Sequence, residues 1–239
     1  MKSIAIVNQK GGSGKTTFSS LLVKALSERG KSVLAIDLDP QGGLSTIYLG
    51  ESDKPRKGLF DFLVNKDLDG SIHETQENLF DGKIDVLPSD YRIDKIFLSL
   101  SPYALKNLSS LPYDYCILDT PPTVQGITKT GMIFAERILI PTEISIQSKA
   151  PSLYTIESIL ELEKTPEIVF SGWKEPSENQ GGYQANLSRD FKNTFSKYLV
   201  GNIPRNSSTV SFASEWKKAT ATHKEGILKA LNEILEGKK

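Results

Sequence analysis

The sequence predicts an α/β fold with a single doubly wound, mostly parallel sheet and helices on both faces. Short, nearly continuous apolar runs alternate with segments of helical periodicity along the 239 residues, as in parallel strands that are buried on both faces. A glycine-rich stretch, residues 8–17, stands directly between the first apolar run and the first helical pattern. That order is typical of a strand–loop–helix phosphate-binding unit. We therefore expect one P-loop domain over residues 1–239.

The elements follow in chain order. The expected strands are residues 4–7, 32–36, 84–87, 115–118, 137–140 and 168–170. Amphipathic helices are expected over residues 155–163 and 185–198, and residues 174–183, rich in glycine and proline, are expected to form a surface loop. Because crossovers between parallel strands are right-handed, the ligand loops should meet at the carboxyl ends of the strands.

The chain ends in a further helical pattern with one apolar stripe: Ile227, Leu228, Leu231, Ile234 and Leu235. Such a stripe is ordinary for a helix that packs on a core. A basic amphipathic helix at the C-terminus could instead bind a membrane surface, and the two lysines that end the chain leave this alternative open. The glutamates within the helix favour core packing.

Composition excludes several classes of protein. The formal net charge is zero, and Cys116 is the only cysteine, which rules out an internal disulfide or a cysteine-rich metal site within one chain. No apolar run approaches the roughly 20 residues of a membrane span, and the first run is too short for a signal peptide. His73 and His223 lie in no motif. We expect a cytoplasmic protein.

The glycine-rich loop carries the strongest functional signal. Gly11, Gly12 and Gly14 leave backbone N–H groups free to converge on one anion at a helix N-terminus, where the helix dipole adds positive potential. Lys15 would reach the β- and γ-phosphates, and the Thr16 hydroxyl would ligate Mg²⁺. Ser13 and Thr17 complete the expected phosphate-binding loop. The chain is therefore expected to bind a nucleoside triphosphate with Mg²⁺.

Carboxylates follow two of the expected strands. Asp37 and Asp39 come after the second strand, and Asp119 ends the strand at 115–118. Phosphoryl transfer requires a group that orients the attacking water, together with metal ligands. Asp39 could hold that water, Asp37 could support the Mg²⁺ shell, and Asp119 could contact the ion. Taken alone, the first pair could equally form a turn that caps a helix.

The loop departs from the ordinary phosphate-loop pattern, because Gln9 stands where glycine is required and a second lysine, Lys10, follows it. This form resembles the deviant phosphate loop of the ParA/MinD superfamily of dimeric ATPases. Matching motifs lie at residues 8–12, 39–41, 86–89, 118–122, 140–143 and 203–206. Gln9 and the Pro40-Gln41 pair favour ParA over MinD, and Ser13 is similar to the small partition ATPases without an N-terminal DNA-binding domain.

The resemblance implies a role for each matched residue. Lys10 would cross an ATP-sandwiched homodimer to touch the partner's nucleotide, and Asp39 would position the hydrolytic water. Pro204 and Arg205 would border the adenine. The segment Ser171-Gly172-Trp173 stands where many relatives have a base-reading asparagine. ATP rather than GTP therefore follows from the family and not from a residue in this chain.

The resemblance also implies binding to non-specific DNA on the nucleoid and stimulation by a ParB-like centromere-binding protein. From Ser171 onward the chain has eleven lysines and arginines against seven acidic residues. Arg189, Lys192, Lys217 and Lys218 are candidates for phosphate contacts. Two alternatives remain: a MinD-like membrane-associated positioning ATPase, and a metabolic P-loop enzyme. The second should show another substrate site, which the sequence does not reveal.

Overall fold

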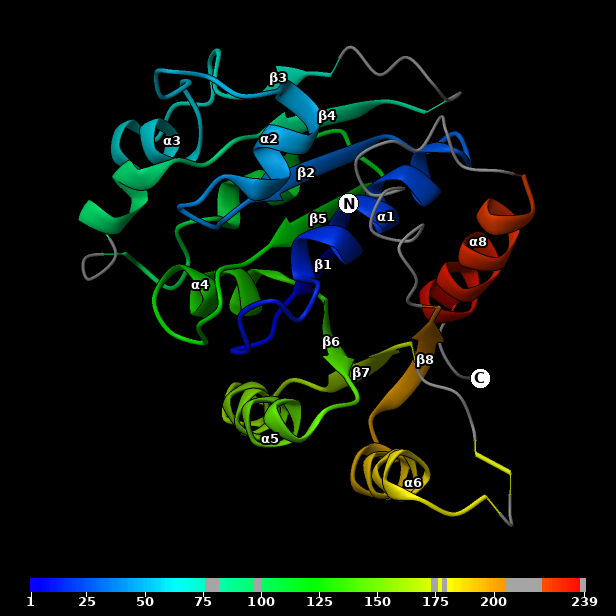
Figure 1. Ribbon diagram of the computed structural model, residues 1–239. Helices are drawn as coiled ribbons and strands as arrows, with labels where there is room; N and C mark the ends of the chain where they lie inside the picture. Colours follow the sequence, from blue (N-terminus) through cyan, green and yellow to red (C-terminus); the bar gives the residue numbers. More distant parts are fainter. Residues whose placement is uncertain (76–81, 97–99, 173–175, 178–179, 205–220, 237–239) are drawn as a thin grey trace.

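The computed structural model describes residues 1–75, 82–96, 100–172, 176–177, 180–204 and 221–236 (Figure 1). One eight-stranded sheet runs in the order β3-β4-β2-β5-β1-β6-β7-β8. The strands are β1 (Lys2–Ile6), β2 (Val33–Asp37), β3 (His73–Glu74), β4 (Ile84–Leu87), β5 (Tyr115–Asp119), β6 (Arg137–Glu143), β7 (Pro166–Ser171) and β8 (Leu199–Ile203). Only the two-residue edge strand β3 pairs antiparallel, so the prediction of a mostly parallel sheet is confirmed.

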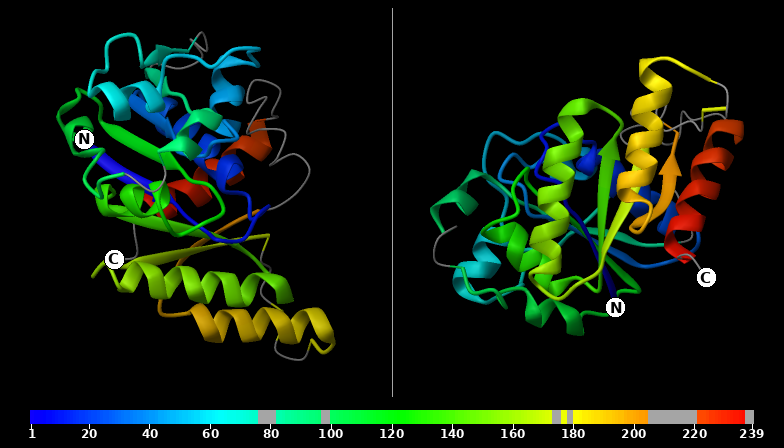
Figure 2. Two further views of the ribbon diagram at one scale, coloured as in Figure 1. Left: turned by 90° about the vertical axis from the view of Figure 1, so that its left-hand side faces the viewer. Right: turned by 90° about the horizontal axis from the view of Figure 1, so that it is seen from below.

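Helices cover both faces of this sheet (Figure 2). They are α1 (Lys15–Ser27), α2 (Gly43–Leu49), α3 (Leu59–Asn65), α4 (Ile127–Phe134), α5 (Ile146–Leu160), α6 (Tyr183–Phe195) and α8 (Ala221–Glu236), with 3₁₀ turns at Tyr91–Lys95 and Lys106–Ser110. Helices α1, α2 and α8 pack on one face. The opposite face is covered by α3, α4, α5 and α6.

The two hydrophobic cores follow from the alternation of side chains along each strand. In β1, for example, Ala5 faces the core under α3 to α6, whereas Ile4 and Ile6 face the core under α1, α2 and α8. Every residue of β2 and β4 is buried. Continuous apolar runs in the sequence therefore correctly predict strands that are buried on both sides.

Two of the differences from the predicted elements concern α5 and β8. Helix α5 begins at Ile146, nine residues before the predicted start, and carries Pro151 in its interior, where proline normally disfavours a helix. Strand β8 was not predicted, because most of its residues are only partly buried and it includes Gly201 and Asn202. Close packing explains this glycine, since a Cβ atom there would lie 2.5 Å from Ile234 Cγ1.

Helix α8 packs on the sheet as predicted. Ile227, Leu231 and Ile234 are buried in the core beneath α1 and β8, so the apolar stripe is already occupied by protein contacts. Among the described helices, none has the length and apolar character needed to cross a bilayer. The expected loop at 174–183 lies partly outside the described residues, and α6 begins at its last position.

Truncation of this buried stripe should destabilise the protein. We expect Leu231→Ala to lower the free energy of unfolding by about 2–5 kcal/mol, because it removes buried methyl groups and leaves a cavity. Urea titration followed by circular dichroism measures the change. Leu160→Ala, which truncates an exposed leucine, is the matched control and should stay within about 0.5 kcal/mol of the parent. Equal effects of the two variants would contradict the assigned packing of α8.

Candidate functional site

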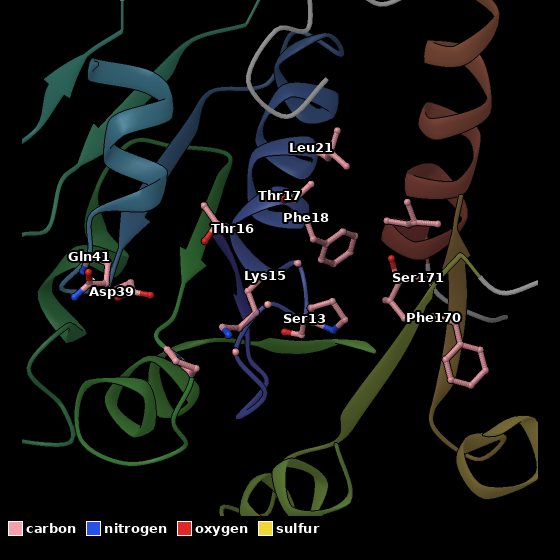
Figure 3. A pocket seen from close by; sticks show the side chains of 17 residues that line it. Ser13, Lys15, Thr16, Thr17, Phe18, Leu21, Asp39, Gln41, Phe170 and Ser171 are labelled. Atoms are coloured by element: carbon pink, nitrogen blue, oxygen red, sulfur yellow. Dashed lines mark hydrogen bonds between the residues drawn. The ribbon is translucent and has the colours of Figure 1, made fainter. Parts of the chain in front are cut away.

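A cavity of about 450 Å³ opens at the carboxyl ends of the strands, where β1 meets α1 and where β7 and β8 end. Figure 3 shows the side chains that line it. One side is formed by the glycine-rich loop, residues 11–17, with Asp39 and Gln41 beside it; Phe18, Leu21, Val169 and Ile203 contribute apolar side chains. The cavity therefore combines a polar region rich in backbone N–H groups with an apolar region.

The glycine loop is open toward this cavity. Gly12 and Gly14 have φ angles of 70° and 86°, a left-handed conformation that glycine adopts without strain. No atom lies within 4 Å of a Cβ added at Gly11, Gly12 or Gly14. No side chain caps α1, and the first intrahelical hydrogen bond is donated by Phe18 N to Gly14 O. The preceding N–H groups therefore have no intrahelical acceptor and could bind an anion.

Lys15 supplies a positive charge at the base of this loop. The lysine is buried, and its Nζ donates a hydrogen bond of 3.3 Å to the backbone oxygen of Lys10. Burial lowers the pKa of Lys15, while the nearby carboxylates of Asp119 and Asp39 act in the opposite direction. An ammonium group that is poorly solvated in this way gains from the approach of an anion.

Asp119 is held by two hydroxyl groups of α1. The Thr16 hydroxyl donates to Asp119 Oδ2 at 2.6 Å, and the Ser19 hydroxyl donates to Oδ1 at 2.9 Å. The carboxylate is fully buried and does not line the cavity, whereas Thr16 does. Asp119 therefore lies behind Thr16, and it orients the hydroxyl that faces the cavity.

Asp37 is equally buried, and its hydrogen-bond donors come from α2 and from the loop after β2. Its Oδ2 accepts hydrogen bonds from Ser45 N at 2.8 Å and Ser45 Oγ at 2.7 Å, and its Oδ1 accepts one from Asp39 N at 3.0 Å. Asp39 itself lines the cavity and accepts a hydrogen bond from Gln41 N. Asp37 thus fixes the loop that presents Asp39, rather than facing the cavity itself.

The two buried carboxylates are register partners on neighbouring strands, Asp37 of β2 opposite Asp119 of β5. Burial raises the pKa of Asp119 to about 7, with a further contribution from the charge of Asp37. Burial also raises the pKa of Asp37 to about 6, although its hydrogen bonds with Ser45 act against this. A divalent cation nearby would favour the ionised form of both groups.

Lys10 points away from the cavity in this structure. Its Nζ donates to Ser148 Oγ at 2.9 Å, to Ser145 Oγ at 3.3 Å and to Glu143 Oε2 at 3.3 Å. These groups belong to the end of β6 and the start of α5. The second lysine of the loop is thus held by its own subunit, and it does not line the cavity that holds Lys15.

Phe170 and Ser171 also line the apolar end of the cavity, and Figure 3 shows Ser171 on the side of the Phe18 ring. The Phe170 ring packs against Phe191 and Phe195 of α6. This end of the cavity is largely apolar. Pro204 is exposed just after β8 and does not line the cavity.

Several predicted contact residues lie away from the cavity or outside the described residues. On α6, Lys192 is exposed. The Arg189 guanidinium donates to the backbone oxygens of Ser177 and Gln180 and so ties α6 to the preceding loop. Arg205, Lys217 and Lys218 lie outside the described residues.

The described residues fit Mg²⁺ only together with phosphate oxygens. In the described part of the chain, no three histidine, cysteine or acidic side chains gather as a metal cage. The Thr16 hydroxyl and Asp39 line the cavity, and Asp119 lies directly behind Thr16. Mg²⁺ is commonly bound by one or two protein oxygens with phosphates and water completing its shell. This donor set agrees with a nucleotide-bound ion.

Sequence reasoning did not identify the serines that support these groups. Ser19, Ser45, Ser145 and Ser148 each bind a predicted site residue. Ser19 had a detectable signal, because it lies one helical turn after Thr16. Ser45 had none, since its partner Asp37 is eight residues away and the two meet only through the fold.

Loss of the Ser45 hydroxyl should lower the free energy of unfolding by an amount that depends on pH. We expect Ser45→Ala to cost about 1–3 kcal/mol above pH 7, because a buried carboxylate loses a donor. This hydrogen bond favours the ionised form of Asp37, whose pKa is about 6, so the deficit should shrink as the pH falls through 6. Urea titrations of the nucleotide-free protein between pH 5 and 8 measure it, with the exposed Ser196→Ala as control. A loss of stability that does not change with pH would contradict a hydrogen bond from Ser45 to the ionised Asp37.

Comparison with known proteins identifies the family of the chain. The profile of the AAA_31 family, described as AAA domain, matches residues 1–165. The chromosome-partitioning ATPase Soj of Thermus thermophilus is 32% identical over 165 residues, which cover 66% of this chain and 63% of Soj. The maintenance of carboxysome distribution protein A of Synechococcus elongatus is 31% identical over 170 residues, which cover 68% and 66%. The chain thus spans slightly less than two thirds of these two relatives.

Solved structures show the same fold over nearly the whole chain. Apo McdA from Cyanothece superimposes with a TM-score of 0.82 at 22% identity and covers 98% of this chain and 99% of its own. A McdA complex with ATP from the same source gives a TM-score of 0.80 at 21% identity and covers 100% and 98%. The family profile, the curated relatives and the deviant phosphate loop all indicate the same family. The chain belongs to the AAA_31 family and is of the ParA type.

Proposed function

We propose that this protein is a Mg²⁺-dependent ATPase that segregates or positions a cellular cargo, and that plasmid or chromosomal DNA is that cargo. The observation that carries the proposal is the phosphate loop, with its open glycines, buried Lys15 and the Thr16–Asp119 pair. Relatives named for chromosome partitioning and for carboxysome distribution support the class of function. Both are positioning tasks, so a cargo other than DNA is the second candidate.

In this proposal, each residue of the site has one task. The loop N–H groups and Lys15 bind the triphosphate, and the apolar end with Phe18 receives the adenine. Mg²⁺, when bound, neutralises developing charge on the phosphates. Thr16, oriented by Asp119, would ligate it, and Asp37 fixes the loop that carries Asp39. Asp39 then orients the attacking water from the cavity wall.

Lys10 would act between two subunits. We infer that two copies meet face to face over ATP and that Lys10 leaves Glu143, Ser145 and Ser148 to contact the partner's phosphates. Its present contacts are charge-assisted hydrogen bonds at a partly exposed position, and a triphosphate offers a stronger anionic partner. Dimerisation would thus depend on the nucleotide.

The dimer would bind non-specific DNA, and a ParB-like centromere-binding partner would stimulate hydrolysis and release it. Lys192 is the described candidate for a phosphate contact, because it is exposed on α6. The excess of basic residues from Ser171 onward supports this assignment. A membrane-associated alternative is less well supported, because the apolar stripe of α8 is buried.

Sedimentation velocity with ATP and Mg²⁺ tests the role of Lys10. We expect Asp39→Ala to accumulate as a dimer, since it binds ATP but hydrolyses it slowly. Adding Lys10→Ala should weaken this dimer about tenfold to a hundredfold, because a charge-assisted contact is lost. Lys106→Ala, an exposed lysine outside the site, is the matched control. Normal dimerisation of the Lys10 variant would exclude the cross-subunit role, and native hydrolysis by Asp39→Ala alone would exclude water positioning.

DNA binding is measured by fluorescence anisotropy with a random-sequence duplex at several salt concentrations. We expect binding only with ATP and Mg²⁺, with an affinity that falls steeply as salt rises. Lys192→Ala should reduce the slope of log K against log[salt] by about 1, whereas Lys106→Ala should leave it unchanged. Binding that needs no nucleotide, or that salt does not weaken, would contradict the proposed cycle.

A further inference from the structure

Helix α5 exposes a stripe of large apolar side chains outside the nucleotide site. Ile146, Leu153, Tyr154 and Leu160 are 66%, 37%, 45% and 45% exposed. They make up half of the large hydrophobic side chains that are exposed in the described part of the chain. An apolar patch of this kind commonly marks an interaction site. We call these four residues the α5 stripe.

The stripe has the spacing of a helix-packing seam. Ile146, Leu153 and Leu160 recur every seven residues, so they lie on one line of the helix, about 10 Å apart. Other positions of α5 are already buried, with Ile156 and Ile159 in the core. On one flank, an ion pair between Lys149 and Asp190 joins α5 to α6, which lies beside it in both views of Figure 2. The stripe is therefore the outer face of a firmly seated helix.

Acidic side chains lie near the carboxyl-terminal half of the α5 stripe. Glu157, Glu161 and Glu163 are exposed, and none forms an ion pair with another described residue. The nearby lysines are engaged, because Lys149 pairs with Asp190 and the Lys164 ammonium donates to the backbone oxygen of Ala135. The surface is thus apolar along one line, with an acidic margin.

We propose that the α5 stripe is a docking surface for a basic amphipathic helix of a partner protein. Such a helix would bury its apolar residues on Ile146, Leu153 and Leu160 and place lysine or arginine beside Glu157 and Glu161. Anionic lipid is disfavoured by these glutamates. A second copy meeting this face with its own stripe brings the same glutamates and the already paired Lys149. No α5 residue lines the nucleotide cavity, so the inference does not depend on the proposed function.

A pair of synthetic peptides tests this surface on the full-length protein. The first is an 18-residue helical peptide with leucine on one face at heptad spacing and lysine on both flanks. The second replaces every lysine with glutamate. Fluorescence anisotropy of the labelled peptides should show binding of the lysine peptide and at least tenfold weaker binding of the glutamate peptide. Leu153→Ser should weaken the lysine peptide at least tenfold. Val64→Ser, which changes a 51% exposed residue of α3, should have no effect.

A charge reversal makes the test specific. The double variant Glu157→Lys and Glu161→Lys should lose affinity for the lysine peptide and gain affinity for the glutamate peptide. Unchanged thermal unfolding shows that these surface variants remain folded. The proposal is overturned if the lysine peptide does not bind, if both peptides bind alike, or if Val64→Ser matches Leu153→Ser. It is also overturned if Leu153→Ser abolishes self-association or vesicle binding of the protein instead.

Discussion

Two buried carboxylates at adjacent strand ends impose the main constraint on this structure. Asp37 and Asp119 are register partners in neighbouring parallel strands, and both are fully buried. Burial of an unpaired carboxylate is costly, so each must be supplied with donors. The N-terminal turns of α1 and the residues of α2 supply them, through Thr16, Ser19 and Ser45. The positions of both helices over the sheet are therefore tied to the charge of the site.

This constraint links folding to chemistry. The hydroxyl that faces the cavity at Thr16 is oriented by Asp119, and the loop that presents Asp39 is held by Asp37. The donors only partly offset the desolvation of the two carboxylates, since the pKa values of both remain raised. A cation in the cavity would relieve this remaining cost. The fold itself thus holds these groups in place, although the charge of Lys15 and the hydrogen-bond donors do not fully offset the desolvation of the two carboxylates.

Much of this site could be predicted, because its main residues follow strand ends or lie within a contiguous loop. The glycines, Lys15, Thr16 and Asp119 needed only the order of strand, loop and helix. The serines could not be predicted, because Ser45 meets Asp37 through a turn whose geometry depends on tertiary packing. Strand β8 was missed for a related reason: its residues, most of them only partly buried, form a strand only because β7 and α8 cover it. The pattern of apolar residues in a sequence indicates which side chains are buried, but it does not indicate which element covers them.

The two lysines of the phosphate loop differ in their surroundings. Lys15 is buried at the base of the loop, and its Nζ donates a hydrogen bond to the backbone oxygen of Lys10. Lys10 is partly exposed and is held by two serine hydroxyls, of which Ser148 is buried, and by the partly exposed carboxylate of Glu143. An ion pair at a partly exposed position, such as that of Lys10 with Glu143, contributes little to stability. A change of partner by Lys10 therefore requires no rearrangement of the core, whereas movement of Lys15 would disturb the loop itself.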